Sequence, residues 1–286
     1  MSNEDGTVKA RPFREIEATT TRSGVSSKLA SRLAVLTRER AEYLFVPLAL
    51  FLFLGLWELT VRLGNYPPFI LPSPGRVYAK FLVVARDGTI WRHTQITLVE
   101  IFGGVALGLT TATLLGYILA QSRLVERILS PYIVASQSIP IVALAPLLVI
   151  WFGFGSLSKI LVCALTLFFP VLINTIIGIR SAERDLRDLM RSLEATRWQV
   201  FTMLEVPAAL PVLLGGLKVG VTLSVIGAVV GEFVGADRGL GFLVNLARGL
   251  FDTPLMFVAL FTLVAIAVSL YAAVAVLEGL LLSWKK

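Results

Sequence analysis

The chain has 286 residues, of which 56% are hydrophobic and 16% charged, with a mean hydropathy of +0.80. Soluble domains carry roughly 25% charged residues, so this composition excludes a chain with water over most of its surface. The formal net charge is +7, and the single cysteine and single histidine exclude an intramolecular disulfide and a cysteine or histidine metal cluster.

Residues 1–43 precede the first apolar run and are rich in Ser, Thr and Arg. This composition predicts a cytoplasmic tail without a packed core of its own. Within the tail, residues 26–42 place Leu29, Leu33 and Leu36 on one helical face. The same stretch can therefore form an interfacial helix at the membrane surface.

Six apolar runs follow the tail, and each is long enough to cross a bilayer as a helix, which takes about 20 residues. None alternates between apolar and polar residues, so helices are expected rather than the strands of a barrel. The runs cover residues 44–63, 96–120, 128–152, 157–179, 211–235 and 254–282. The sequence therefore predicts an all-α membrane protein with about six transmembrane helices, in which residues 44–286 form one transmembrane domain.

The basic residues predict how the chain is oriented in the membrane. Lys and Arg are more frequent in the connecting segments that lie inside when the N-terminus is cytoplasmic. Both termini are then cytoplasmic, residues 64–95 lie outside and residues 180–210 lie inside. The prolines of the outer loop predict a rigid turn, and residues 77–84 predict a short surface helix. Because the basic residues flank the spans, the positive charge indicates orientation and not binding of nucleic acid.

Prolines and polar side chains mark special places within the spans. Pro131, Pro140 and Pro146 predict that the third span is kinked or broken, and such helices usually face a cavity or a partner helix. Polar groups at membrane depth are costly and suggest a substrate pathway. An interhelical hydrogen bond by Asn or Gln, and snorkelling of the glutamate to the surface, are the alternatives. The candidate pathway residues are Gln137, Ser138, Asn174, Ser224 and Glu232.

The fifth span carries glycines at spacings of four and seven residues, which share roughly one helical face. In lipid, such a face lets two helices approach closely. The candidate packing residues are Gly216, Gly220, Gly227 and Gly231.

Residues 180–210 predict a helix, a turn and a second helix on the cytoplasmic side. Ser181 is expected to cap the first helix, which carries an apolar stripe at helical spacing. The segment from Thr196 to Gln199 fits a capping box that starts the second helix, and Pro207 and Pro211 are expected to end it. The stripe consists of Leu186, Leu189, Met190 and Leu193. A simple tether between spans is the alternative.

Catalytic motifs are absent from the sequence. It contains no G-x-x-x-x-G-K-[ST] phosphate-binding loop and no readable Ser/His/Asp or paired-carboxylate arrangement. We therefore expect a chain that is not an enzyme. The residues alone leave open a transporter driven by an ion gradient and a membrane scaffold without a transport function.

The inner loop resembles the EAA loop of the permease subunits of bacterial binding-protein-dependent ABC importers. The stretches that carry the resemblance are residues 193–199 (LEATRWQ), 206–211 (VPAALP) and 216–218 (GLK). By register, the family's Glu-Ala-Ala-type triplet falls on Asp188, Leu189 and Met190. Residues 71–74 (LPSP), 143–147 (ALAPL), 168–170 (FFP) and 239–241 (GLG) are similar to the branch that imports sulfonates, taurine, nitrate or bicarbonate and pyrimidine-type vitamin precursors.

The resemblance implies a permease subunit in the bacterial inner membrane that forms the substrate pathway of an ATP-driven importer. It implies a second copy of the chain, two separate ATPase subunits that hold the ATP and Mg, and a periplasmic or lipoprotein substrate-binding protein. No cofactor is implied in this chain, and the substrate is expected to be a small anionic or heterocyclic nutrient.

The resemblance also implies which residues couple the permease to its ATPases. Glu194 departs from the family, which has a glycine here, and a left-handed turn at this position would cost a non-glycine residue roughly 1 kcal/mol. The implied coupling residues are Asp188, Leu189, Met190, Glu194, Ala195, Thr196 and Arg197.

Overall fold

The computed structural model describes residues 47–283, so the tail and its predicted interfacial helix at residues 26–42 lie outside the described residues. The helix Pro47–Gly64 belongs to one compact unit, and residues 66–283 belong to a second. No β-strand occurs among the described residues. The elements of the second unit are α2 (Pro74–Arg86), α3 (Thr89–Gln121), α4 (Arg123–Gln137), α5 (Ile141–Phe152), α6 (Ser156–Arg180), α7 (Arg184–Ser192), α8 (Arg197–Val200), the π-helical segment η1 (Phe201–Glu205), α9 (Val206–Gly235), α10 (Leu240–Gly249) and α11 (Thr253–Leu281).

The long helices agree with the prediction of about six membrane spans. Within the described residues, 5 helices are long and apolar enough to cross a membrane, and a bent pair raises the number to 6. The five are Pro47–Gly64, α3, α6, the continuous helix Arg197–Gly235 and α11. The bent pair is α4 and α5, which together cover the predicted third span.

The third span is broken, as its prolines predicted. α4 ends at Gln137, α5 begins at Ile141, and the two axes differ by 90°. Pro140 is the N-cap of α5, where its missing N–H costs no helical hydrogen bond. Pro131 and Pro146 lie inside α4 and α5, so only one of the three prolines marks the break.

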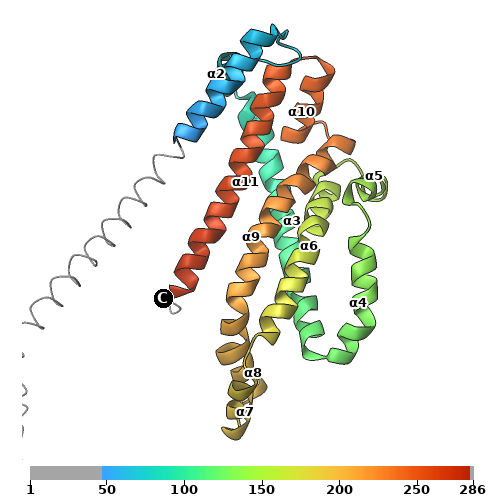
Figure 1. Cartoon of the computed structure of the whole chain (residues 1–286). Helices are drawn as coiled ribbons and strands as arrows, with labels where there is room; N and C mark the ends of the chain where they lie inside the picture. Colours follow the sequence, from blue (N-terminus) through green and yellow to red (C-terminus); the bar gives the residue numbers. More distant parts are fainter. Residues whose placement is uncertain (1–46, 284–286) are drawn as a thin grey trace, which may run out of the picture. The chain divides into compact units, whose positions relative to one another are not determined.

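α6 packs along both α3 and α9, and we call these three helices the slab (Figure 1). At its core lie Leu167 and Leu172 of α6 and Ala112 of α3, which are fully buried. Glycines allow backbone to approach backbone at these contacts. A Cβ at Gly104 would lie 2.2 Å from the Cβ of Cys163, so α3 and α6 could not keep this distance with any larger residue.

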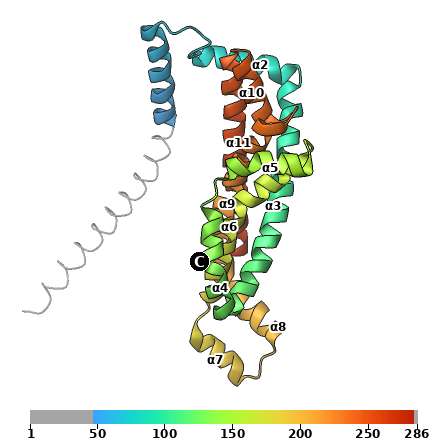
Figure 2. The same cartoon turned by 90° about the vertical axis from the view of Figure 1, so that its right-hand side faces the viewer.

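The two ends of the second unit carry different elements. α7 and α8 lie at one end, which we call the loop end, and α2 and α10 lie at the opposite end (Figure 2). At the opposite end, Lys80 of α2 pairs with Asp252 at 2.5 Å, and the Thr253 hydroxyl donates to the Phe69 carbonyl at 2.5 Å. α2 confirms the helix predicted over residues 77–84, and Ser73 caps it.

Asp87 follows α2 and begins the turn into α3. Its carboxylate accepts a hydrogen bond from the Thr89 amide at 2.8 Å, and this bond lowers the pKa of Asp87 below its usual value.

Candidate functional site

α7 is a short amphipathic helix at the loop end, with Leu186 and Leu189 exposed. Its N-cap is Glu183, whose side chain makes no capping hydrogen bond. The prediction that Ser181 caps this helix was wrong. Ser181 is the C-cap of α6, and its hydroxyl donates to the Gly178 carbonyl at 2.7 Å. The Ser181 side chain therefore caps the end of α6 and not the start of α7.

The turn after α7 is a Schellman motif, in which the last helical carbonyls accept hydrogen bonds from the residues just beyond the helix. The Glu194 amide donates to the Arg191 carbonyl at 3.0 Å, and the Ala195 amide donates to the Met190 carbonyl at 2.9 Å. Glu194 has a φ of 53°, the left-handed conformation expected at the family's glycine position. The chain therefore keeps the turn despite the unfavourable residue.

The predicted capping box at Thr196 is present. The Gln199 amide donates to the Thr196 Oγ1 at 3.3 Å, and the Thr196 amide donates to the Gln199 side-chain oxygen at 2.8 Å. The helix that starts here does not end at Pro207 or Pro211, as predicted, but continues through η1 into α9. Pro207 is the second residue after the π-helical segment, so the carbonyl that its ring would clash with in a regular α-helix, that of Met203, lies in the wider π-helical turn.

Large apolar side chains are exposed along the α7–η1 segment. Leu189 is 53% exposed and Trp198 is 70% exposed, although such residues are normally covered. We call this group the loop surface, and it consists of Leu186, Leu189, Leu193, Trp198 and Met203.

The residues that the family resemblance implied for coupling lie on the same segment as the loop surface, and Leu189 belongs to both. Asp188, Leu189, Glu194, Thr196 and Arg197 are exposed, and Met190 and Ala195 are half-buried. These residues lie within ten positions of one another at the loop end, and their part in coupling stays a prediction.

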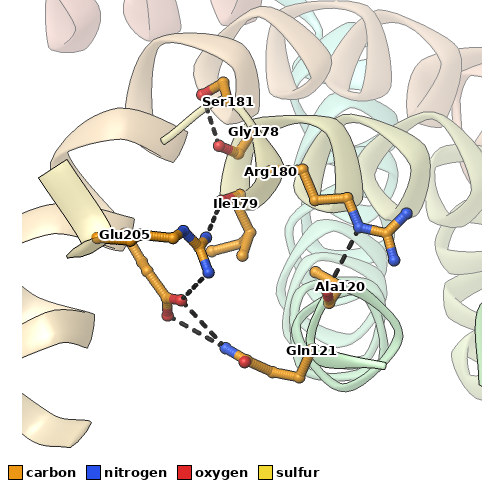
Figure 3. A network of polar contacts seen from close by, with 8 residues as sticks. Ala120, Gln121, Gly178, Ile179, Arg180, Ser181 and Glu205 are labelled. Carbon is orange, nitrogen blue, oxygen red and sulfur yellow. Dashed lines mark hydrogen bonds and ion pairs between the residues drawn. The ribbon is translucent and has the colours of Figure 1, made fainter. Parts of the chain in front are cut away.

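A polar network lies beneath the loop surface, centred on Glu205, which is 3% exposed (Figure 3). The Glu205 carboxylate accepts hydrogen bonds from the Gln121 amide nitrogen at 3.2 and 3.3 Å. It also pairs with Arg187 of α7 at 3.3 Å, and Arg187 donates to the Ile179 carbonyl at 3.0 Å. This network was not predicted from the sequence, although an acidic residue within the apolar run that leads into the fifth span was a signal for it.

Arg180 adds a second set of contacts at the same end of the slab. It donates to the carbonyls of Leu119 and Ala120 at 3.1 and 3.3 Å, and it pairs with Glu126 of α4. The ends of α3, α4 and α6 are therefore tied together next to the Glu205 network.

At the opposite end, Glu232 is 1% exposed and therefore does not snorkel. Its carboxylate accepts hydrogen bonds from the Thr97 hydroxyl at 2.7 Å and from the backbone amides of Gly241 and Phe242. The Thr97 oxygen in turn accepts from the Leu240 amide at 2.8 Å. Together, Glu232 and Thr97 satisfy the first three amides of α10, which would otherwise be unpaired in the protein interior.

The five candidate pathway residues do not meet in one place. Gln137 and Ser138 are exposed at the break between α4 and α5, whereas Ser224 is fully buried in α9. Asn174 is half-buried, and its amide donates to the Pro170 carbonyl of its own helix at 2.8 Å. A place for these residues and for Glu232 on a substrate path stays a prediction.

Three of the candidate packing glycines lie against α6 at short range. A Cβ on Gly216 would lie 2.6 Å from Asn174, one on Gly227 would lie 2.6 Å from Thr166, and one on Gly231 would lie 3.1 Å from Lys159. At Gly220 the nearest atoms would be 3.3 Å away, so this contact is looser.

Comparison with known proteins places this architecture in a family. Residues 104–282 match the model of the binding-protein-dependent transport system inner membrane component. The chain belongs to this family. The permease is thus a multi-pass inner-membrane component of an ABC importer, which decides against the ion-gradient transporter and the scaffold. In this family the permease chain has no catalytic activity and no cofactor, because a separate subunit hydrolyses ATP.

Individual relatives support the assignment. The riboflavin transport system permease protein RibX of Chloroflexus aurantiacus is 48% identical, over 91% of this chain and 97% of its own. The formylaminopyrimidine transport permease protein ThiX of Halalkalibacterium halodurans is 38% identical, over 81% of this chain and 92% of its own. Permeases named for aliphatic sulfonates and taurine also match, which confirms the resemblance to that branch.

A solved structure supports the fold alone. An inward-facing structure of the MetNI methionine ABC transporter matches with a TM-score of 0.54 and 21% identity, over 69% of this chain and 94% of that chain.

Proposed function

We propose that two copies of the permease form the translocation pathway of an importer for a nitrogen heterocycle, and that the loop surface binds the ATPase subunits. A substrate-binding protein would deliver the nutrient at the opposite end. In this arrangement residues 44–286 are the transmembrane domain, residues 1–43 are a cytoplasmic tail, and both termini lie in the cytoplasm. Within the coarser class of small anionic or heterocyclic nutrients, the heterocycle is favoured because RibX and ThiX are named for riboflavin and a formylaminopyrimidine.

The observation that carries the coupling proposal is the exposure of the loop surface. Leucine, tryptophan and methionine side chains are exposed along one short ordered segment, and Asp188 on the same segment has its side chain 70% exposed. A patch of this kind on an ordered segment is typical of a surface that binds another protein. An apolar groove on an ATPase subunit would cover the leucines, and Asp188 would meet a basic group at its edge.

The first experiment tests the loop surface. Leu189→Glu would place a charge in the buried contact, Asp188→Arg would reverse the charge at its edge, and Ala195→Trp would overfill the turn. We expect each variant to insert normally and to lose most of the ATPase that copurifies with an affinity-tagged permease. Substrate-stimulated ATP turnover in reconstituted vesicles should fall in parallel. Glu183→Gln is the matched control, because Glu183 is exposed and its side chain caps nothing.

Retention of the ATPase and unmutated uptake in all three variants would show that the inner loop is only a tether. Glu194→Gly should be tolerated, since glycine adopts the left-handed conformation without strain.

The second experiment tests the substrate class. The permease, its ATPase and its binding protein would be reconstituted together, and uptake of labelled riboflavin and of a labelled aminopyrimidine would be measured. We expect unlabelled heterocycles to compete and taurine not to compete. Uptake of taurine without uptake of either heterocycle would contradict the substrate proposal and leave the coupling proposal intact.

A further inference from the structure

Arg187 faces away from the loop surface and connects α7 to the spans. Among the described residues, it is the one α7 side chain whose hydrogen bonds and ion pairs reach the transmembrane helices. The other polar side-chain contacts of α7 stay within the helix, as between Arg191 and Asp188 at 3.4 Å. α7 therefore has an exposed apolar side and a single polar attachment on its other side.

Glu205 receives this attachment at a special point of the chain. It is the last residue of the π-helical segment, where the inner loop continues into the fifth span without a break. Single π-helical turns inside α-helices occur frequently at functional sites. The Glu205 carboxylate is almost fully buried, and Arg187 and Gln121 lie 3.2–3.3 Å from it. A buried carboxylate that lost Arg187 would be left without its countercharge, so the pair strongly favours one position of α7.

The ends of α3 and α6 and the start of α9 meet at this pair. Gln121 is the last residue of α3, the Ile179 carbonyl belongs to the end of α6, and Glu205 leads into α9 (Figure 3). These are the three helices of the slab, which glycine contacts hold at short distance along their length. A movement of Arg187 would therefore act on the whole slab and not on one helix.

We infer that the Arg187–Glu205 pair, held by Gln121 and the Ile179 carbonyl, is the joint that passes movement of α7 to the slab. This inference rests on the proposed function, because it takes the loop surface to be the place where the ATPase pushes. Arg187 and Glu205 are positioning residues in this scheme, and neither contacts substrate or nucleotide. Without the joint, the ATPase still binds α7, but its closure moves α7 without turning the slab.

The test separates binding of the ATPase from transmission of its movement. Arg187→Met removes the charge, the ion pair with Glu205 and the hydrogen bond to Ile179, while leaving the loop surface unchanged. Arg191→Met is the matched control, because it makes the same replacement on the same helix, at a side chain that is 83% exposed and bonded only within α7. ATPase retention, ATP turnover and uptake would be measured together in vesicles that contain the complete importer.

We expect Arg187→Met to retain the ATPase and to hydrolyse ATP, while the number of substrate molecules taken up per ATP falls about fivefold or more. Arg191→Met should leave this ratio unchanged. Arg187→Lys keeps the charge but cannot reproduce the forked contact to Glu205 and Ile179, so an intermediate ratio is expected. A purely structural role for the pair would lower the amount of folded importer without changing the ratio.

Arg187→Met alone leaves the buried Glu205 charge unpaired and could misfold for that reason. The double variant Arg187→Met with Glu205→Gln leaves no unpaired buried charge. It should unfold at the temperature of the unmutated importer and still show the lowered ratio. The inference would be wrong if the double variant took up as many substrate molecules per ATP as the unmutated importer. It would also be wrong if Arg187→Met lost the ATPase. The proposed function is tested separately by Leu189→Glu, and it would fail if this variant retained the ATPase.

Discussion

A single buried carboxylate can hold the N-terminus of a helix that begins several residues further along the chain. Glu232 is the clearest case, because it receives the Thr97 hydroxyl and two amides of α10 while being 1% exposed. Gly239 has a φ of 108°, and a Cβ there would lie 2.3 Å from this carboxylate. The close approach of the turn to Glu232 therefore depends on glycine at this position.

Replacement of this carboxylate should loosen α10. Glu232→Gln keeps the shape but puts an amide where two N–H groups and a hydroxyl need an acceptor, so we expect the free energy of unfolding to fall by about 2 kcal/mol. Thermal unfolding of the purified permease in detergent measures the change, with Glu183→Gln as the exposed control. Equal unfolding temperatures for the two variants would show that the capping hydrogen bonds contribute nothing.

At the scale of elements, the contact between α6 and α9 depends on the absence of side chains. A Cβ at Gly227 would lie 2.6 Å from the Thr166 hydroxyl and 2.9 Å from the Cys163 backbone, whereas a Cβ at Gly215 would meet nothing within 4 Å. Both glycines lie in α9, so they share the same helical background. Substitutions at these two glycines can therefore separate the effect of packing against α6 from the effect of helix propensity.

We expect Gly227→Ala to destabilise the permease by about 1–3 kcal/mol through overpacking, and Gly215→Ala to be neutral or slightly stabilising. Gly227→Leu should also broaden the gel-filtration peak in detergent, whereas Leu223→Phe, which keeps an apolar side chain, should not. Identical unfolding of the two alanine variants would mean that α9 can shift away from α6 at little cost.

At the scale of the whole molecule, the two ends of the second unit are expected to face opposite sides of the membrane. The loop end carries Ser192 in α7, and the opposite end carries Asp237 before α10. Cys163 is fully buried and should not react with a polar maleimide, so cysteines can be introduced into the unmodified sequence.

In intact cells, an impermeant maleimide should label Asp237→Cys without disruption of the membrane and should label Ser192→Cys only after the membrane is opened. Labelling of both cysteines from outside would contradict the predicted topology. The unmodified permease serves as the control for reaction at Cys163.

Local chemistry made much of this architecture predictable from the sequence. Hydropathy located the spans, Pro140 marked the break, and the Thr196 capping box started the helix that becomes the fifth span. The end of that helix was mispredicted at Pro207, because a π-helical turn that accommodates a proline has no known signal in composition.

The polar networks could not be predicted in the same way, because their members are far apart in the chain. Gln121 and Glu205 are separated by 84 positions, and Thr97 and Glu232 by 135. Lys159 of α6 is also buried and donates to the Gly235 carbonyl at the end of α9, 76 positions along the chain, at 2.5 Å. Only the packing of the slab brings such groups together.

The loop surface also has a consequence for the life of the protein in the cell. A newly made permease without an ATPase partner would present Leu189, Leu193 and Trp198 to the cytosol, where chaperones and proteases recognise exposed apolar side chains. Unassembled copies should therefore be degraded faster than assembled ones. The steady-state amount of permease would then follow the supply of its ATPase, so that the loop surface would set subunit stoichiometry as well as coupling.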